Sequence, residues 1–257
     1  MKILFIGDIM GNEGVSIVQR HLKSIVKLNA IDFVFANGEN AHNGKGINRD
    51  IANRLFDAGV DIISMGNHTF NNYDILKLFD DEYKIIRPLN LPYDTPGDGY
   101  IIMEKNGINV CVINLMGMLF MNHTDNPFNT MDRVLDKISD KSKIIIVDFH
   151  AEATSEKMAL GRYLDGRVTA VLGTHTHVVT ADEQILPNNT AYITDVGMTG
   201  SHNGVIGAAT EAGLHSFTSA IPERLRLAEG NVKMNTVIIS VNENTGKAEK
   251  IERLCIE

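Results

Sequence analysis

The chain has 257 residues, of which 44% are hydrophobic and 22% are charged. That composition is typical of a globular protein with a sizeable core, and it excludes a disordered, fibrous or disulfide-stapled chain. The formal net charge is −8 with neutral histidines. Without a basic run, a chain of this charge is a poor general binder of nucleic acid.

The cellular setting is indicated by the apolar segments and the cysteines. No stretch approaches the roughly 20 apolar residues that a membrane-spanning helix needs, and Asp8 interrupts the N-terminal apolar run too early for a signal peptide. Cys111 and Cys255 lie outside any CxxC motif, which favours free thiols in a reducing compartment. We therefore expect a soluble cytoplasmic protein without a membrane partner.

The N-terminal part of the chain predicts alternating strands and helices. Short apolar runs, typical of strands buried on both faces, occur at residues 3–6, 33–36 and 62–65. Apolar residues at helical spacing predict one helix over 15–25 and another over 51–56. Asn48 is the expected N-cap of the second helix, and Gly59 is its expected end.

The rest of the chain adds further strands and two hairpins. Asn106-Gly107 predicts a tight turn between strands at 100–104 and 110–115. Asn244-Thr245-Gly246 predicts a second hairpin between 236–241 and 250–256. A helix is expected over 155–164, and the remaining buried strands are expected at 144–149, 170–172 and 191–194.

Buried strands that alternate with helices, followed by antiparallel hairpins, predict an α/β fold. We expect a layered αββα sandwich in which helices flank two mixed β-sheets. No linker, repeat or shift in composition divides the chain, so residues 1–257 are expected to form a single domain.

Five of the predicted strands end in a short polar cluster that contains a side chain able to bind a metal. The clusters are Gly7-Asp8, Gly38-Glu39-Asn40, Gly66-Asn67-His68, Asp148-Phe149-His150 and Gly173-Thr174-His175-Thr176-His177. In open α/β sheets, ligand sites lie beyond the carboxyl ends of the strands, so the five clusters can converge on one crevice. Glycine beside four of them lets backbone and ligand approach closely.

With Asp148 set aside, the clusters together offer two carboxylates, two amides and four imidazoles. These groups are too many for one tetrahedral ion and about right for two metals, with a carboxylate such as Glu39 between them. Taken singly, Asp8 could be a turn former and His150 a satisfied core histidine. His175 and His177 are the strongest signal, because two imidazoles two residues apart after a buried strand are costly without a ligand. Convergence of all five clusters favours the two-metal site.

The other histidines join no such motif. His21 lies within the first predicted helix, and His123 and His215 lie in stretches without a partner motif, so we expect surface or structural roles. His42 and His202 lie in loops rich in glycine and asparagine that could edge the site. Structural roles are favoured for these two as well.

The order of the motifs from Asp8 to His177 resembles the calcineurin-like metallophosphoesterase superfamily. That pattern is an Asp-x-His after the first strand, a Gly-Asp, a Gly-Asn-His, a single His and a Gly-His-x-His. The sequence departs from it at Met10, where the superfamily has a histidine, and at Glu39, which replaces the usual aspartate. Both departures, with the motifs at 148–152 and 195–200, resemble the bacterial YmdB-type branch, described as a phosphodiesterase of cyclic nucleotides, 2′,3′-cyclic ones included.

The resemblance implies a ligand set for each metal, carried over position by position. One metal would be held by Asp8, Glu39, Asn40 and His177, with Asn40 replacing the histidine lost at Met10. The second would be held by Glu39, Asn67, His150 and His175. Glu39 would bridge, and His68 would stay unliganded. Nitrogen and oxygen ligands suit iron, manganese and zinc alike, and no substrate-binding residue is indicated.

The expected function is hydrolysis of small phosphodiesters, above all 2′,3′-cyclic nucleotides and secondarily 3′,5′-cyclic ones, by a hydroxide held between the metals. His68, free beside the ligand Asn67, would act as general acid on the leaving ribose oxygen, which is worth about 10²–10⁴ in rate. The sequence does not indicate which residue orients His68.

Two rival functions remain open. One is a phosphomonoesterase or nuclease that uses the same metals, because substrate choice lies in loops around the ligands. The other is a regulatory or RNA-binding protein whose metals are structural, although such a site has no use for an unliganded His68. The resemblance also implies a homo-oligomer.

Overall fold

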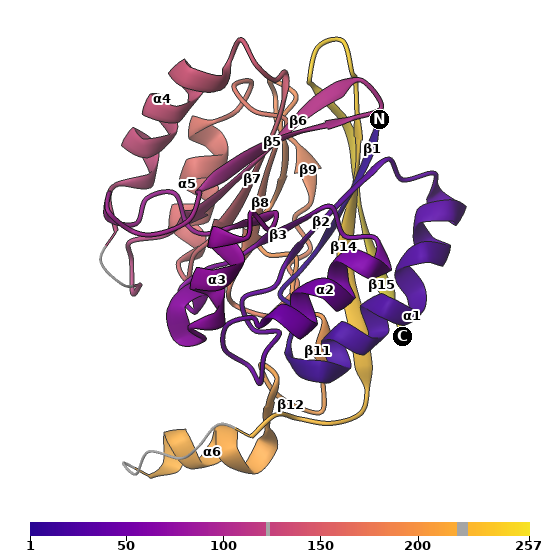
Figure 1. Cartoon of the computed structure of the whole chain (residues 1–257), viewed down its shortest axis with the longest axis vertical. Coiled ribbons are helices and arrows are strands. Elements are labelled where there is room, and N and C mark those ends of the chain that lie inside the picture. The colour runs from indigo at the N-terminus through magenta and orange to yellow at the C-terminus, as the bar shows by residue number, and fades with distance from the viewer. Residues whose placement is uncertain (122–123, 220–225) are drawn as a thin grey trace.

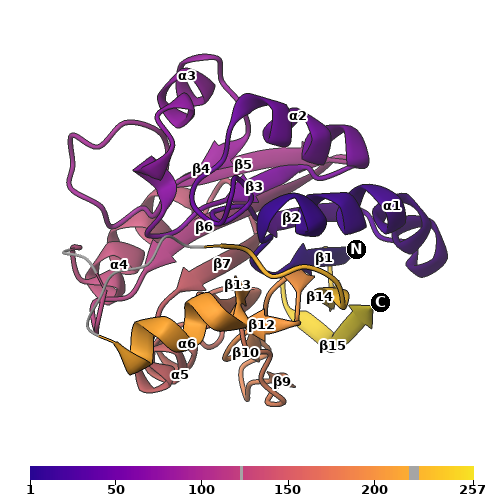
Figure 2. The same ribbon diagram turned by 90° about the horizontal axis from the view of Figure 1, so that it is seen from below.

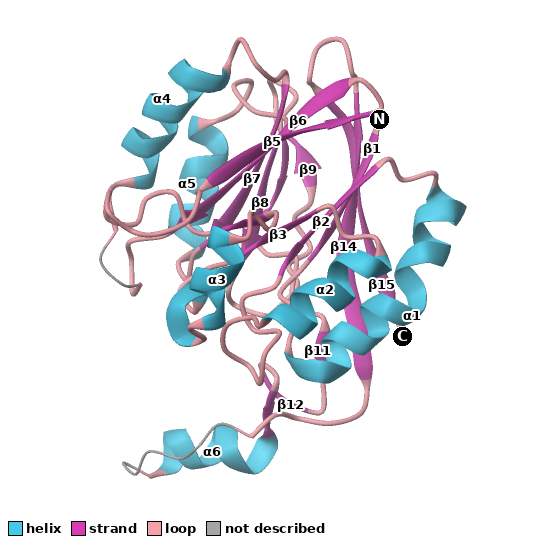
Figure 3. Cartoon of the chain, in the orientation of Figure 1, coloured by secondary structure: helices cyan, strands magenta, loops and turns pink. Residues whose placement is uncertain are grey.

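The computed structural model describes residues 1–121, 124–219 and 226–257. Two β-sheets lie face to face in the middle of the molecule, and helices cover the outer face of each sheet (Figure 1, Figure 3). This arrangement confirms the predicted αββα sandwich with two mixed sheets. In the part of the chain that is described, no helix combines the length and apolar character needed to cross a membrane.

The first sheet is built mainly from the N-terminal part of the chain. Its strand order is β11-β14-β1-β2-β3-β4, and β15 also pairs with β14. Strands β1 to β4 run parallel, whereas β14 is antiparallel to β1, β11 and β15. The strands are β1 (Lys2–Ile6), β2 (Phe33–Asn37), β3 (Ile62–Ser64), β4 (Ile85–Ile86), β11 (Gly200–Ser201), β14 (Val232–Val241) and β15 (Ala248–Ile256).

The second sheet has the order β5-β6-β7-β8-β10-β9. Strands β6, β7, β8 and β10 run parallel, and β5 and β9 pair antiparallel at the two edges. Asn106 and Gly107 connect β5 to β6 with φ angles of 53° and 78°, the left-handed pair that a type I′ turn requires, so the predicted hairpin is confirmed. The strands are β5 (Tyr100–Lys105), β6 (Ile108–Met116), β7 (Ile144–His150), β8 (Ala170–Thr174), β9 (Gln184–Ile185) and β10 (Ala191–Ile193).

Helices α1 (Gly11–Asn29), α2 (Arg49–Ala58) and α3 (Asp74–Asp80) cover the first sheet, and α4 (Pro127–Ile138) and α5 (Thr154–Tyr163) cover the second. The predicted caps of α2 are confirmed. Asn48 Oδ1 accepts a hydrogen bond from the Ile51 backbone N–H (2.9 Å). Gly59 ends the helix with a φ of +114°.

Strand β1 illustrates how the layers are packed. Ile3 and Phe5 face the second sheet, while Leu4 and Ile6 face the helices. Successive side chains of a strand point to opposite faces, so burial of both faces explains the uninterrupted apolar sequence. Between the sheets, Phe5 stacks on Phe35 with ring centroids 4.2 Å apart.

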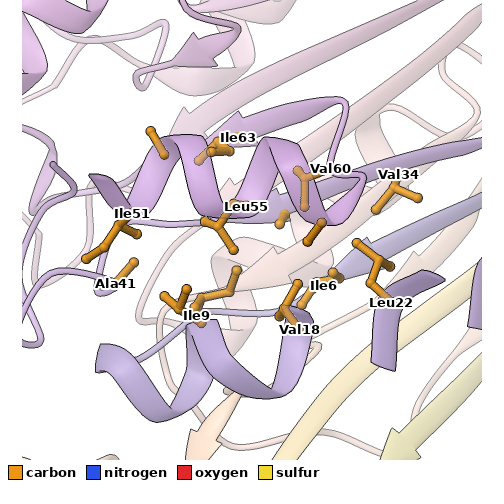
Figure 4. Close-up of a cluster of buried hydrophobic side chains, with 14 of the residues drawn as sticks. Ile6, Ile9, Val18, Leu22, Val34, Ala41, Ile51, Leu55, Val60 and Ile63 are labelled. Carbon is orange, nitrogen blue, oxygen red and sulfur yellow. The ribbon is translucent and has the colours of Figure 1, made fainter. Parts of the chain in front are cut away.

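The core between the helices and the first sheet is drawn in Figure 4. Val18 from α1 and Leu55 from α2 meet Ile6 from β1 and Ile63 from β3 in this cluster. These residues lie at the helical and strand spacings from which the elements were predicted. The core therefore fixes where the carboxyl ends of β1, β2 and β3 lie.

A smaller segment projects from the end of the molecule. It consists of β12 (Gly204–Val205), β13 (Ala208–Ala209) and α6 (Thr210–Thr218). In Figure 1, α6 lies beyond β12, away from the sheets. In Figure 2, which views the molecule from below, α6 runs across the end of the molecule from which this segment projects. The turn between β12 and β13 contains Ile206 and Gly207, which have φ angles of 45° and 91°.

Candidate metal centre

The predicted ligands come from both sheets. Because β1, β2 and β3 are parallel, and β7 and β8 are parallel, their carboxyl ends gather at one edge of each sheet. The first sheet contributes Asp8, Glu39, Asn40, Asn67 and His68, and the second contributes His150, His175 and His177. The structure brings all five clusters together where these two edges meet.

Glu39, His150 and His175 form the tightest group. Each offers one ligand atom, and these atoms lie within 4.8 Å of one another. Glu39 Oε1 is 3.1 Å from His150 Nε2, and His175 Nδ1 is 3.0 Å from the same nitrogen. Asn67 Oδ1 lies 2.9 Å from it as well. Three nitrogen and oxygen donors thus lie within 3.1 Å of a fourth, and this donor set suits a divalent transition metal.

Asp8, Asn40 and His177 form a second group beside the first. Asp8 is fully buried, and its Oδ2 accepts a hydrogen bond from the His175 backbone N–H (3.2 Å), while Oδ1 has no hydrogen-bond partner. Among the described residues, the ionisable nitrogen closest to Oδ1 is His150 Nδ1, 3.8 Å away. A buried carboxylate oxygen without a hydrogen bond is costly, and a cation is the partner that fits it.

The two other members of this second group are placed for the same cation. Asn40 Oδ1 lies 3.3 Å from His177 Nε2. His177 Nδ1 lies 2.9 Å from the Ile206 carbonyl oxygen, so Nδ1 carries the proton and Nε2 is free to bind a metal. The turn between β12 and β13 thereby sets the orientation of a candidate ligand.

Gly66 explains why glycine stands before the Asn67-His68 pair. A Cβ at this position would lie 2.5 Å from both Glu39 Oε2 and His150 Nε2. Any larger residue would displace a ligand of the first group. The glycine is therefore required by the close approach of the backbone to the cluster.

A chain of hydrogen bonds orients His150 from behind the cluster. His150 Nδ1 lies 2.9 Å from Thr174 Oγ1, and that hydroxyl donates to Asp148 Oδ1 (2.7 Å). Because the hydroxyl proton is used on Asp148, Nδ1 keeps its proton as the donor, and Nε2 is the nitrogen that a bound cation would take. Ser64 Oγ (2.5 Å) and Asn37 Nδ2 (3.0 Å) donate to Asp148 Oδ2, which connects this strand of the second sheet to β3 and β2.

His68 lies beside the cluster and is oriented by Asn71. Its backbone N–H donates to Glu39 Oε2 (2.9 Å), and its Nδ1 lies 2.8 Å from Asn71 Oδ1. Asn71 belongs to the 3₁₀ turn η1 (Thr69–Asn71), three residues after the histidine. Sequence reasoning missed this residue, although the i, i+3 spacing was a usable signal.

The charges of the first group shift one another's pKa values. Burial opposes ionisation of Glu39, but the charges of His150 and His68 and their hydrogen bonds together outweigh it and lower the pKa of Glu39 to about 2. Burial also disfavours the charged form of His150, yet the carboxylates of Glu39, Asp8 and Asp148 together raise the pKa of His150 to about 9. Burial and the His150 charge lower the pKa of His175 to about 3. Burial raises the pKa of Asp8. The group is thus arranged around one positive charge, which a bound cation would supply.

Met10 has a packing role at the position where the superfamily has a histidine. It is buried, and a Cβ on Gly207 would lie 2.8 Å from Met10 Cγ and 2.9 Å from Met198 Sδ. Met10 and Met198 thus pack against the turn that carries Ile206. Through that turn, Met10 supports His177.

Two acidic residues outside the predicted set also position ligands. Asp195 Oδ2 accepts hydrogen bonds from Lys157 Nζ (2.7 Å) and from the backbone N–H and hydroxyl of Thr176 (3.1 and 2.8 Å). It therefore fixes the loop that carries His175 and His177. Glu152 Oε2 lies 3.1 Å from His175 Nε2. The sequence signal for both was an acidic residue close to the end of a buried strand: Asp195 directly follows the predicted strand 191–194, and Glu152 lies two residues after β7.

The other histidines described by the structure belong to neither ligand group. His42 and His202 make hydrogen bonds within neighbouring loops. His21 lies in α1 and His215 in α6. His123 lies outside the described residues.

Comparison with known proteins places the chain among relatives that match it over its whole length. The family model described as "YmdB-like protein" matches residues 4–254. The 2′,3′-cyclic-nucleotide 2′-phosphodiesterase of Bacillus subtilis is 44% identical over 256 residues, which is 100% of this chain and 97% of the relative.

Two solved structures are similar to this one. A hypothetical protein from Thermus thermophilus has a TM-score of 0.94 at 41% identity, covering 100% of this chain and 99% of its own. A structure described as a novel phosphatase, from Mycoplasma pneumoniae, has a TM-score of 0.94 at 36% identity, covering 100% and 93%.

Proposed function

Since this chain belongs to the YmdB-like protein family, we propose that it is a metal-dependent phosphodiesterase of small substrates, 2′,3′-cyclic nucleotides above all. The observation that carries this proposal is the convergence of nitrogen and oxygen donors from five strand ends, with His68 unliganded beside them. The name of the Bacillus subtilis relative supports the choice of substrate.

We assign two divalent cations to the centre. Asp8, Asn40 and His177 would hold one of them, Asn67, His150 and His175 the other, and Glu39 would be shared. Against two carboxylates, the cations leave a local charge of about +2, which suits a phosphodiester monoanion although the chain carries −8. When bound, the cations would supply an activated water and neutralise the phosphate oxygens. The donor set suits iron, manganese and zinc.

His68 is proposed as the general acid. The leaving group is a ribose oxygen, which departs poorly unless it receives a proton. Asn71 Oδ1 accepts from His68 Nδ1–H, so the opposite ring nitrogen, Nε2, is the one that donates to the substrate when the imidazole carries both of its protons. The bond between the His68 backbone N–H and Glu39 Oε2 holds the residue at a fixed place beside the shared ligand.

A substrate panel with defined metal loading tests the proposal. Initial rates are measured on 2′,3′-cyclic AMP, 3′,5′-cyclic AMP, adenosine 3′-monophosphate and a short RNA. We expect the 2′,3′-cyclic diester to be hydrolysed fastest. Faster hydrolysis of the monoester or of RNA would favour the rival phosphomonoesterase or nuclease. Absence of any hydrolysis with the metals bound would favour a regulatory or RNA-binding role.

Variants of His68 and Asn71 test the role of His68. His68→Ala is expected to lose about 10²–10⁴ in turnover on the cyclic nucleotide while elemental analysis gives an unchanged metal content. Asn71→Ala should lose less, because the imidazole is still present but no longer held. Near-normal turnover by His68→Ala on an unactivated diester would remove the residue from the mechanism.

The remaining expectations stay predictions. Residues 1–257 are proposed to act as a single domain, since both sheets contribute ligands to one centre. The cytoplasmic setting follows only from the sequence, and the homo-oligomer only from the resemblance. Light scattering after size-exclusion chromatography measures the molar mass and hence the oligomeric state.

A further inference from the structure

A cavity of about 300 Å³ adjoins the metal centre. Phe70, Leu91 and Met116 form apolar parts of its wall, and the amide side chains of Asn67 and Asn71 form polar parts. Its volume is at the lower end of the range for small-molecule sites. Because Asn67 is also a candidate metal ligand, the cavity and the centre share a wall residue.

The two amides have hydrogen-bonding capacity to spare. Asn67 Oδ1 faces His150 Nε2 (2.9 Å), and Asn71 Oδ1 faces His68 Nδ1 (2.8 Å). Neither Nδ2 group has a partner in the described ranges of the chain. The cavity therefore offers hydrogen-bond donors next to an aromatic and aliphatic wall. A nucleobase matches this combination, because it has apolar ring faces and edges that accept hydrogen bonds.

The chemistry of the reaction gives the direction in which the nucleoside must lie. When a 2′,3′-cyclic phosphate opens, a water oxygen forms a new bond to phosphorus, and the bond between phosphorus and one ribose oxygen breaks. The freed ribose oxygen takes a proton. That oxygen remains part of the nucleoside. The nucleoside consequently lies on the side of the proton donor, His68, and Asn71 both holds His68 and lines the cavity.

Resting on the proposed function, we propose that this cavity binds the nucleobase of the substrate. It is then a specificity site, in which Phe70 and Leu91 contact the faces of the base and the Asn67 and Asn71 amides donate to its edge or to the ribose. A diester without a base would still reach the metals, but it would bind more weakly.

Kinetics with and without the base test the proposal. The substrates are 2′,3′-cyclic AMP and the base-free methyl riboside 2′,3′-cyclic phosphate, each with the metal-loaded wild type. Leu91→Trp fills the cavity, and Tyr93→Trp is the matched control, because Tyr93 lies two residues away and is 98% exposed. We expect Leu91→Trp to raise KM for 2′,3′-cyclic AMP roughly tenfold to a hundredfold, which corresponds to the binding free energy of one stacked base. KM for the base-free substrate should not change, and Tyr93→Trp should alter neither.

A binding measurement gives a second readout that does not depend on turnover. The chain has no tryptophan, so Phe70→Trp introduces a single fluorophore into the cavity wall. Adenosine, which lacks a phosphate, should quench its fluorescence by stacking, and it should leave the fluorescence of Tyr93→Trp unchanged. This measurement also stands if Leu91→Trp fails to fold.

The outcomes separate the two proposals. If Leu91→Trp leaves KM for cyclic AMP unchanged, or raises KM for both substrates equally, the base site is wrong while the phosphodiesterase stands. If the wild type hydrolyses neither substrate, the proposed function is wrong, and quenching of Phe70→Trp by adenosine alone decides the base site. Absence of quenching then overturns it.

Discussion

Replacing Asp148 with asparagine should reverse the hydrogen-bond chain that orients His150. In the native chain, the Thr174 hydroxyl donates to Asp148 Oδ1 (2.7 Å), and His150 Nδ1–H donates to that hydroxyl (2.9 Å). Asparagine can keep its oxygen toward the donors Ser64 and Asn37, which leaves its Nδ2 facing Thr174. The hydroxyl must then donate to Nδ1, and the ring proton moves to Nε2, the nitrogen that faces the metal centre.

The expected cost is a loss of metal affinity. Removing a partner of a metal-binding histidine typically lowers affinity 10- to 100-fold, which is about 1.4 to 2.7 kcal/mol. Asp148→Asn belongs at the upper end, because it places the single proton of the neutral ring on the ligand atom in addition to removing a bond. The dissociation constant is measured by competition with a chromogenic chelator at pH 8. Burial raises the pKa of Asp148 to about 6, so the wild-type carboxyl is ionised under these conditions.

Two variants of Thr174 provide the controls for this experiment. Thr174→Ser keeps the hydroxyl and should bind metal like the wild type. Thr174→Val interrupts the chain without reversing it and should lie between the wild type and Asp148→Asn. If Asp148→Asn, folded by circular dichroism, binds metal as tightly as Thr174→Ser, the hydrogen-bond chain does not set the tautomer of His150 and the reasoning is refuted.

Three further predictions concern backbone space, pH and metal removal. Gly66→Ala places a Cβ 2.5 Å from Glu39 Oε2 and His150 Nε2, so turnover should fall about 10²-fold or more and elemental analysis should find less metal. Gly107→Ala is the control: it lies in an open turn with a φ of +78° and should lose stability but keep its metal. A full metal content in Gly66→Ala would contradict the steric argument. Partial burial opposes ionisation of Asp182, but hydrogen bonds from hydroxyl groups outweigh it and lower its pKa below 3.8. The stability that this carboxylate contributes is therefore present above pH 3.8 and is lost as the pH falls through the lowered pKa. In urea titrations, Asp182→Asn should be less stable than wild type at neutral pH, and the gap should close in acid; a gap independent of pH would exclude this linkage. Chelation should lower the midpoint of thermal unfolding, because the ligands join two sheets. The free energy of unfolding should fall by about 4 kcal/mol if the ion had been present at about 1,000 times its dissociation constant. An unchanged midpoint in calorimetry would mean that no ion connects the sheets.

The elements predicted from the sequence are those whose signals are local. Strands such as β1 are buried on both faces, so an apolar run identifies them. α4 was missed although Asn126 caps it and Pro127 opens it, both signals at helix starts. β11 to β13 could not be predicted, because strands of two residues carry no periodicity. β11 forms by pairing with the distant β14, and β12 and β13 pair with each other.

The candidate site divides in the same way. The proposed ligands follow buried strands, and parallel strands end at a common edge, so residue type and position were enough to place them together. The groups that orient them depend on tertiary packing. The carbonyl of Ile206 has the same chemistry as any other backbone carbonyl, and only the turn between β12 and β13 brings it to His177. Thr174 lies within a quoted motif, but its role depends on Asp148 behind it.

The buried Asp148 carboxylate has a consequence for how the two sheets are aligned. Apolar faces attract without direction, so packing alone would tolerate one sheet sliding a little along the other. Hydrogen bonds are directional, and those from β2 and β3 to a single residue of β7 admit one alignment. The spacing between ligands of opposite sheets is thus determined inside the core, before any ion arrives. Loops at the rim can then diverge between relatives and change the accepted substrate, while the centre keeps its dimensions.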